Sequence, residues 1–167
     1  MDLKKAAFFL LAALVLAFTG TKSARADGKI KIDIPVKLKK ADVVFDLSHP
    51  SFFGDMPVGL KYMDMLENSL RAMGTRGHVV GLFYGKGAYM ALNDKAYDSF
   101  RKISTGNPYK GMIGGLIKKG ARLEECAVSM KANKWGNADL LPGVKVDSGA
   151  VSRLVQLVHQ GYVVMEP

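Results

Sequence analysis

The sequence has very little cysteine, because Cys126 is the only one among its 167 residues. A single cysteine excludes a disulfide within the chain, whereas exported domains commonly carry such bonds. The thiol of Cys126 is therefore either buried and inert or retained for its sulfur chemistry. Most of what the sequence predicts about function depends on which of these two interpretations holds.

Several other functional patterns are missing as well. The three histidines, His49, His78 and His159, lie far apart in the chain and suggest no catalytic triad. The segment Gly85-Lys86-Gly87 lacks the glycine spacing of a phosphate-binding loop. No internal repeat or low-complexity segment is present. We therefore predict neither a bound cofactor nor a resident metal ion.

Residues 1–26 have the three-part pattern of a secretory signal peptide. Lys4 and Lys5 precede an apolar run over residues 6–18, and Ala24-Arg25-Ala26 offers small residues where a signal peptidase reads. The run is shorter than the roughly 20 residues that a membrane-spanning helix needs. No cysteine lies near the cleavage point and no Arg-Arg pair precedes the run, which disfavours a lipid anchor and twin-arginine export. We expect cleavage after Ala26, no stable membrane insertion afterwards, and an exported product that is periplasmic if the source is bacterial.

Residues 27–39 are interpreted as a basic N-terminal arm. The chain has a formal net charge of +9, and its densest basic cluster comprises Lys29, Lys31, Lys37, Lys39 and Lys40. Such a stretch can contact anionic lipid or nucleic acid. We favour a solvated arm and expect no nucleic-acid partner, because the protein is predicted to be exported. The remaining residues 40–167 suit a single domain with its own core.

Apolar strands and amphipathic helices alternate along this domain. Strands are predicted over residues 41–47, 78–84, 121–126, 144–146 and 162–165, with helical segments between them. A strand that returns to the same sheet through a helix pairs in parallel, with a right-handed crossover. The pattern therefore predicts an α/β fold with a mainly parallel sheet of about five strands and helices on both faces. Ligands of such sheets bind at the carboxyl ends of the strands, where Cys126 is expected to lie.

The last predicted helix has a clear apolar stripe. Val151, Leu154, Val155 and Val158 follow helical spacing, and we expect them to face the sheet. Ser148 is the candidate N-cap of this helix.

An ordered set of short motifs resembles the DsrE/DsrF-like family. The motifs are Gly120-Ala121-Arg122-Leu123-Glu124-Glu125-Cys126, Ser129-Met130-Lys131, Asp139-Leu140-Leu141-Pro142-Gly143-Val144 and Gly161-Tyr162, with Tyr84-Gly85-Lys86-Gly87 upstream. The resemblance covers residues 40–167 and implies a three-layer α/β/α domain that assembles into trimers or hexamers. It also implies that, as in some members, the cysteine ending this strand carries sulfur as a persulfide. Cys126 matches that position, although Glu124 and Glu125 replace the apolar residues that usually precede it.

The surroundings of Cys126 decide whether its sulfur is reactive. The N-terminus of the helix that follows favours the thiolate, which is the reactive species, and Lys131 adds positive charge. Glu124 and Glu125 oppose it, because nearby negative charge disfavours a second one. The candidate pocket residues around the sulfur are His49, Ser48, Asp55, Met130 and Lys131.

Three functions remain open at this point. The first is an exported carrier that accepts sulfur on Cys126 and passes it between partner proteins, more a relay than a turnover enzyme. The alternative is a non-catalytic oligomeric binding or assembly module in which the cysteine is buried and inert. The third is a copper-handling protein, since thiolate and methionine sulfur suit Cu(I).

Overall fold

The computed structural model describes residues 30–167, so the predicted signal peptide lies outside the described residues. The described residues fall into two units, residues 30–35 and residues 36–167. In the first unit, residues 30–35 contain neither helix nor strand, and the side chains of Ile30, Ile32 and Ile34 are exposed. Regular structure begins at Lys40.

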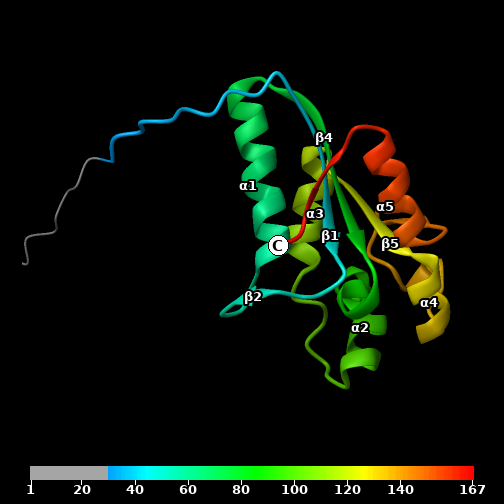
Figure 1. The fold of residues 1–167 in the computed structure, drawn as a ribbon. Coiled ribbons are helices and arrows are strands. Elements are labelled where there is room, and N and C mark those ends of the chain that lie inside the picture. Colours follow the sequence, from blue (N-terminus) through cyan, green and yellow to red (C-terminus); the bar gives the residue numbers. More distant parts are fainter. Residues whose placement is uncertain (1–29) are drawn as a thin grey trace, which may run out of the picture. The chain divides into compact units, whose positions relative to one another are not determined.

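The second unit is built on a five-stranded sheet with the order β6-β5-β4-β1-β7 (Figure 1). The strands are β1 (Lys40–Leu47), β4 (Arg76–Phe83), β5 (Arg122–Cys126), β6 (Lys145–Asp147) and β7 (Val163–Met165). All four neighbouring pairs are parallel. The predicted parallel α/β sheet of about five strands is therefore confirmed.

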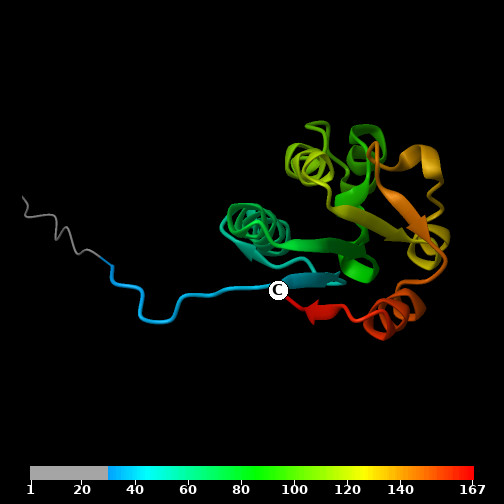
Figure 2. The same cartoon turned by 90° about the horizontal axis from the view of Figure 1, so that it is seen from above.

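The helices form two layers around this sheet and a group at its carboxyl edge. They are α1 (Val58–Met73), the 3-10 helix η1 (Gly85–Ala91), α2 (Asp94–Arg101), α3 (Lys110–Lys119), α4 (Ala127–Asn133), the 3-10 helix η2 (Asn137–Asp139) and α5 (Ala150–His159). A short hairpin of β2 (Phe52–Phe53) and β3 (Met56–Pro57) precedes α1. Seen from above, α1 and α3 lie on one face of the sheet and α5 lies on the other (Figure 2). The chain thus has the three-layer α/β/α arrangement.

The central strands are apolar on both faces because helices cover both. In β1, Val43 and Phe45 belong to the main core beneath α1, whereas Val44 belongs to a smaller cluster with Leu157 of α5. Successive side chains of a strand point to opposite faces, so one apolar run serves both layers. The second layer is thin, because α5 contributes only Leu154 and Leu157 to this cluster.

The helix α5 differs from the prediction in the side that it turns to the sheet. Ala150 and Leu157 are buried, whereas Val151, Val155 and Val158 are 70%, 53% and 45% exposed. Arg153 bonds Glu124 beneath the helix, and this pairing turns most of the predicted stripe away from the sheet. The predicted cap is also wrong, because Gly149 occupies the N-cap position and no side chain caps the helix.

None of the helices within residues 30–167 is long and apolar enough to cross a membrane.

Candidate functional site

Cys126 lies at the carboxyl end of β5, where it is also the N-cap residue of α4. Its side chain is buried, with 4% of its surface exposed. The sulfur accepts a hydrogen bond from the backbone N–H of Ala150, the first residue of α5, at 3.3 Å. An unpaired N–H at a helix N-terminus stabilises negative charge on the atom that it faces. The donor helix is therefore α5, whereas the sequence pointed to α4.

Glu124 shares the α5 face of the sheet with Cys126, but its charge is compensated. Arg153 donates to both of its carboxylate oxygens, from Nε at 2.7 Å and from a terminal nitrogen at 2.9 Å. Arg122 adds an ion pair, with its Nε 2.6 Å from Oε1. The carboxylate in turn raises the pKa of Arg153. A bidentate arginine pair of this kind neutralises much of the negative charge that was expected to oppose a thiolate.

Glu125 points to the opposite face of the sheet, on the side of Leu123 and the main core. It is fully buried, and neither of its carboxyl oxygens has a hydrogen-bond partner among the described residues. Burial raises the pKa of Glu125 to about 9, with a further contribution from the neighbouring sulfur of Cys126. A carboxyl group with this pKa is protonated at neutral pH. Glu125 therefore does not carry the negative charge that its sequence position suggested.

Asp147 is a member of the site that the sequence analysis missed. It ends β6 and is the register partner of Cys126 on β5. Paired residues of neighbouring parallel strands point to the same face, so both lie on the α5 side. The side chain is 8% exposed, and neither carboxyl oxygen has a hydrogen-bond partner in the described part of the chain. Burial raises the pKa of Asp147. The backbone N–H of Gly149 lowers it by a smaller amount, although this N–H is not placed well enough to form a hydrogen bond with the carboxyl group.

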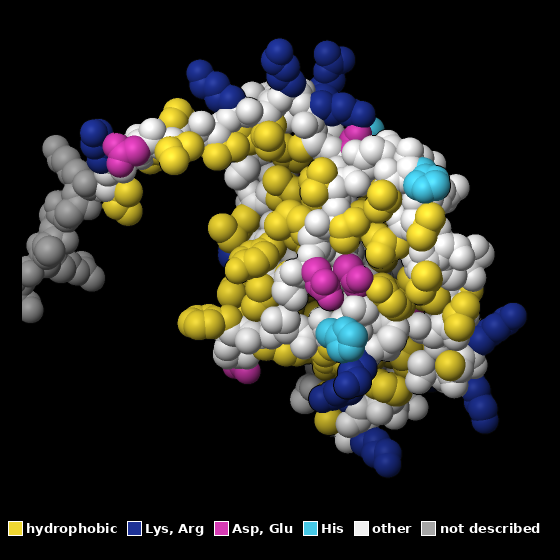
Figure 3. All heavy atoms as spheres, viewed as in Figure 1, with side chains coloured by type: hydrophobic (Ala, Val, Ile, Leu, Met, Phe, Trp, Pro, Cys, Tyr) yellow, Lys and Arg dark blue, Asp and Glu magenta, His cyan; other side chains and the backbone are white. Residues whose placement is uncertain are grey.

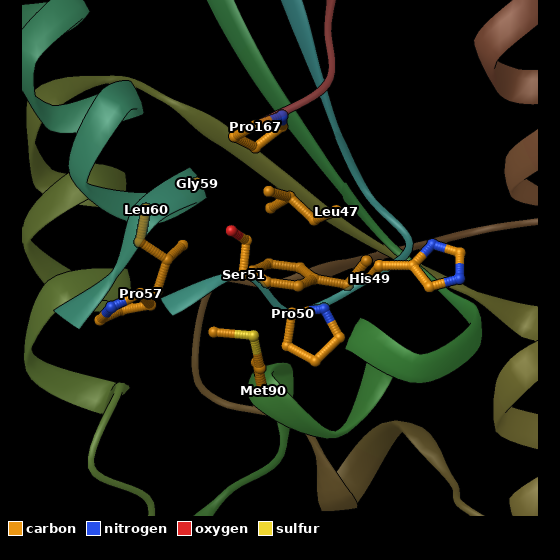
Figure 4. Close-up of a pocket in the computed structure, with 10 residues that line it drawn as sticks. Leu47, His49, Pro50, Ser51, Pro57, Gly59, Leu60, Met90 and Pro167 are labelled. Atoms are coloured by element: carbon orange, nitrogen blue, oxygen red, sulfur yellow. The ribbon is translucent and has the colours of Figure 1, made fainter. Parts of the chain in front are cut away.

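Two predicted pocket residues, Ser48 and His49, follow β1 and not β5. The hydroxyl of Ser48 lies 3.0 Å from Nδ1 of His49. The strand β4 separates β1 from β5 in the sheet. His49 borders a small cavity together with Leu47, Leu60 and Phe83, but its imidazole points away from the other lining residues (Figure 4). The cavity of about 10 Å³ has room for about one water molecule, and Cys126 does not line it.

The other three predicted pocket residues lie in three different surroundings. Asp55 stands in the turn between β2 and β3, where it borders an open groove with Tyr109 and Met112. Met130 packs into the main core. Lys131 is exposed in the last turn of α4, at the end opposite Cys126. Within residues 30–167, no group of three or more His, Cys, Asp or Glu side chains is arranged to hold a metal ion.

The site is therefore assembled mainly from β5, β6 and α5. Its members are the buried sulfur of Cys126, the N–H of Ala150, the compensated pair of Glu124 with Arg153, and the unpaired carboxyl of Asp147. Chemically, this arrangement combines a nucleophilic sulfur, a donor that stabilises negative charge on it, and a nearby group that can hold a proton.

The solved structures that are similar to this one include the following two. Protein MTH1491 from Methanobacterium thermoautotrophicum is 19% identical, with a TM-score of 0.56 over 77% of this chain and 98% of that chain. The YchN protein from E. coli is 11% identical, with a TM-score of 0.52 over 76% of this chain and 99% of that chain. At these identities the similarity shows a shared fold. None of the curated proteins is significantly similar to the sequence. Residues 63–167, more than half of the chain, match the DsrE/DsrF-like family, and the chain belongs to this family.

Proposed function

We propose that this protein is an exported sulfur carrier, which accepts a sulfane sulfur on Cys126 and passes it to a partner protein. Membership of the DsrE/DsrF-like family supports a role of the sulfur-relay type. The observation that carries the proposal is the hydrogen bond from the Ala150 N–H to the sulfur of Cys126. It directs a charge-stabilising donor at the one atom of the chain that can hold a persulfide.

The proposed reaction is an exchange between a thiolate and a persulfide. The Cys126 thiolate attacks the outer sulfur of a donor persulfide, the donor's S–S bond breaks, and the donor leaves as a thiolate. Cys126 then carries the transferred sulfur as its own persulfide, with no net oxidation or reduction. A thiolate of the acceptor protein removes that sulfur by the same step. Because Cys126 is buried, both steps require local opening of the segment between β6 and α5.

Cyanide-releasable sulfur tests this proposal. Cyanide takes the outer sulfur of a persulfide as thiocyanate and leaves the thiolate. After exposure to glutathione persulfide and removal of the excess, the wild type should release about one thiocyanate per chain. The Cys126→Ser variant should release none. Equal release by both proteins, or none from either, would overturn the carrier role.

The alternative function is a non-catalytic oligomeric binding or assembly module with an inert cysteine. The burial of Cys126 favours this alternative, because a buried thiol behaves as a small hydrophobic side chain. Under it, Cys126→Ser leaves both the stability and the assembly of the protein unchanged, and glutathione persulfide adds no sulfur to the wild type.

We propose further that copies of the chain assemble, as a trimer or a hexamer, through the outer face of α5. The exposed side chains of Val151, Val155 and Val158 form an apolar stripe on this helix, and Val128 of α4 is exposed as well. Hydrophobic side chains are also visible over α1 and near the C-terminus in Figure 3. Contiguous apolar surface of this kind marks protein contacts.

Export is the remaining part of the proposal. Expression of the full chain in a bacterial host, followed by osmotic release of the periplasm, should give a mature protein that begins at Asp27. Recovery of only the uncleaved chain in the cytosol or the membrane fraction would contradict it.

A further inference from the structure

Asp147 is a buried carboxyl group that bonds to no other group in the described structure. Neither of its oxygens has a hydrogen-bond partner in the described residues, and burying such a group without partners costs free energy. The neighbouring Glu124 has both oxygens bonded to Arg153. An unpartnered carboxyl group at this depth therefore calls for a functional reason.

The position of Asp147 relative to Cys126 supplies one. The two residues are register partners on β6 and β5, and both lie on the α5 face. Neighbouring strands are about 4.8 Å apart, so the carboxyl group and the thiol occupy adjacent positions on this face, although they form no hydrogen bond to each other in the structure. Asp147 also begins the short segment that ends at Ala150, whose N–H bonds the sulfur. The proposed proton acceptor, Asp147, and the donor that stabilises charge on the sulfur, the Ala150 N–H, thus lie at the two ends of the same connection between β6 and α5.

The other charged groups around Asp147 are already engaged or lie elsewhere. Arg153 of α5 and Arg122 of β5 both pair with Glu124. Lys145 of β6 is exposed, and Glu125 of β5 points to the opposite face of the sheet. In residues 30–167, Asp147 consequently forms no ion pair of its own.

We propose that Asp147 accepts the proton of the Cys126 thiol during sulfur transfer and returns it to the departing thiolate of the donor. This role rests on the proposed carrier function. The proton moves from Sγ to the Asp147 carboxylate, the sulfur of Cys126 bonds the outer sulfur of the donor, and the donor's S–S bond breaks. The donor thiolate then takes the proton from Asp147, so the carboxylate is regenerated and charge and atoms balance. The raised pKa of Asp147 suits it to this exchange, because it makes the carboxylate a stronger base than an exposed one.

Two rates measured on the same proteins test this role. Wild type, Asp147→Asn and Asp33→Asn are treated with glutathione persulfide, and the gain of about 32 Da at Cys126 is followed by mass spectrometry. In parallel, Cys126 is alkylated with iodoacetamide. Asp33→Asn removes one negative charge at an exposed position of the arm and serves as the matched control.

The expected result is a split between the two rates. Sulfur transfer to Asp147→Asn should fall by about 100-fold. Alkylation should fall less, because it needs the same thiolate but its iodide leaving group takes no proton, whereas the departing donor thiolate does. In a plot of the transfer rate against pH, the part of the curve that reflects ionisation of the Asp147 carboxyl group should also be absent from this variant. Asp147→Glu should recover part of the transfer rate, and Asp147→Ser should reproduce the slow transfer if the asparagine variant does not fold.

The contradicting outcomes separate the two proposals. If the wild type gains no sulfur, the carrier function itself is overturned. If the wild type gains sulfur and Asp147→Asn gains it at the same rate, only the role of Asp147 is overturned. An equal loss of transfer and alkylation would also overturn it, because that result indicates a change in access to the sulfur.

Discussion

Arg153 and Glu124 join α5 to β5 through two charge-assisted hydrogen bonds, of 2.7 and 2.9 Å. The pair fixes the rotation of α5 on the sheet, so that Ala150 reaches the sulfur of Cys126 and Val155 faces outwards. One ion pair therefore links the site to the exposed face of the helix.

Loss of this pair should destabilise the protein. Arg153→Gln leaves the buried carboxylate of Glu124 with Arg122 as its remaining ion-pair partner, and we expect the free energy of unfolding to fall by about 2–4 kcal/mol. Urea denaturation measures this loss. Arg76→Gln, at an exposed position of β4, is the control and should change stability by less than about 0.5 kcal/mol. An equally small effect of Arg153→Gln would show that the pair does not hold α5 in place.

Ionisation of Glu125 should make the stability of the protein depend on pH. The folded state keeps this carboxyl group protonated up to a pKa of about 9, whereas the unfolded chain releases the proton near the ordinary pKa of 4.5. Between these two values the folded state binds more protons, so the free energy of unfolding falls as the pH rises. Glu125→Gln removes this dependence. The free energy of unfolding of the variant, compared with that of the wild type, should rise by on the order of 2 kcal/mol from pH 5 to pH 8.

Urea denaturation at the two pH values tests this expectation. Glu166→Gln, which removes an exposed carboxyl group near the C-terminus, should follow the wild type at both. A difference between Glu125→Gln and the wild type that does not grow with pH would show that Glu125 is already ionised in the folded protein.

The outer face of α5 should control assembly. Val155→Asp places a charge in the exposed apolar stripe, so we expect a fall in the molar mass measured by light scattering, from an oligomer to a monomer. Because Val155 is more than half exposed, the monomer should remain folded. Ser152→Asp adds the same charge at another exposed position of the helix and should keep the oligomer. The proposed interface is wrong if the wild type is monomeric or if both variants keep its mass.

The turn after β4 should tolerate no side chain at Gly87. A Cβ atom there would lie 1.9 Å from the backbone oxygen of Leu47, and the Gly87 N–H already bonds the oxygen of Ser48 at 2.9 Å. Gly87→Ala should therefore lower the free energy of unfolding by more than about 2 kcal/mol. The contrasting variant is Gly114→Ala in α3, where a Cβ atom meets nothing within 4 Å.

Thermal denaturation of the two glycine variants distinguishes the positions. Gly114→Ala should raise stability by about 0.5–1 kcal/mol, because alanine favours a helix. If Gly87→Ala melts at the wild-type temperature, the close approach of this turn to β1 is not maintained in solution.

Much of the fold could be predicted because its signals are local. The apolar run of β1, the glycine that ends α1 and the strand that ends at Cys126 all lie within short segments of sequence. Their alternation fixes a parallel sheet with helices on both faces. The position of Cys126 at the carboxyl edge followed from the same pattern.

The rotation of α5 could not be predicted, because the helix offers two apolar faces. Ala150, Leu154 and Leu157 have helical spacing just as Val151, Val155 and Val158 do. The choice between these faces depends on Arg153 meeting Glu124, a contact across 29 residues. No periodicity within the helix reports such a contact.

The roles of the acidic residues could not be predicted either, because they too depend on contacts between residues that are distant in the sequence. Glu124 and Glu125 look alike in the sequence, yet one is paired with arginine and the other is buried and protonated. Asp147 joined the site only through the pairing register of β5 and β6. The predicted pocket residues Ser48 and His49 follow β1, which lies beyond β4 from Cys126.

The most direct test of the carrier function is the mass of the folded protein after brief exposure to glutathione persulfide at neutral pH. The account predicts a gain of about 32 Da that peptide mapping places on Cys126, and no gain in Cys126→Ser. An unchanged mass of the wild type, under conditions that load a small thiol of comparable reactivity, would contradict it.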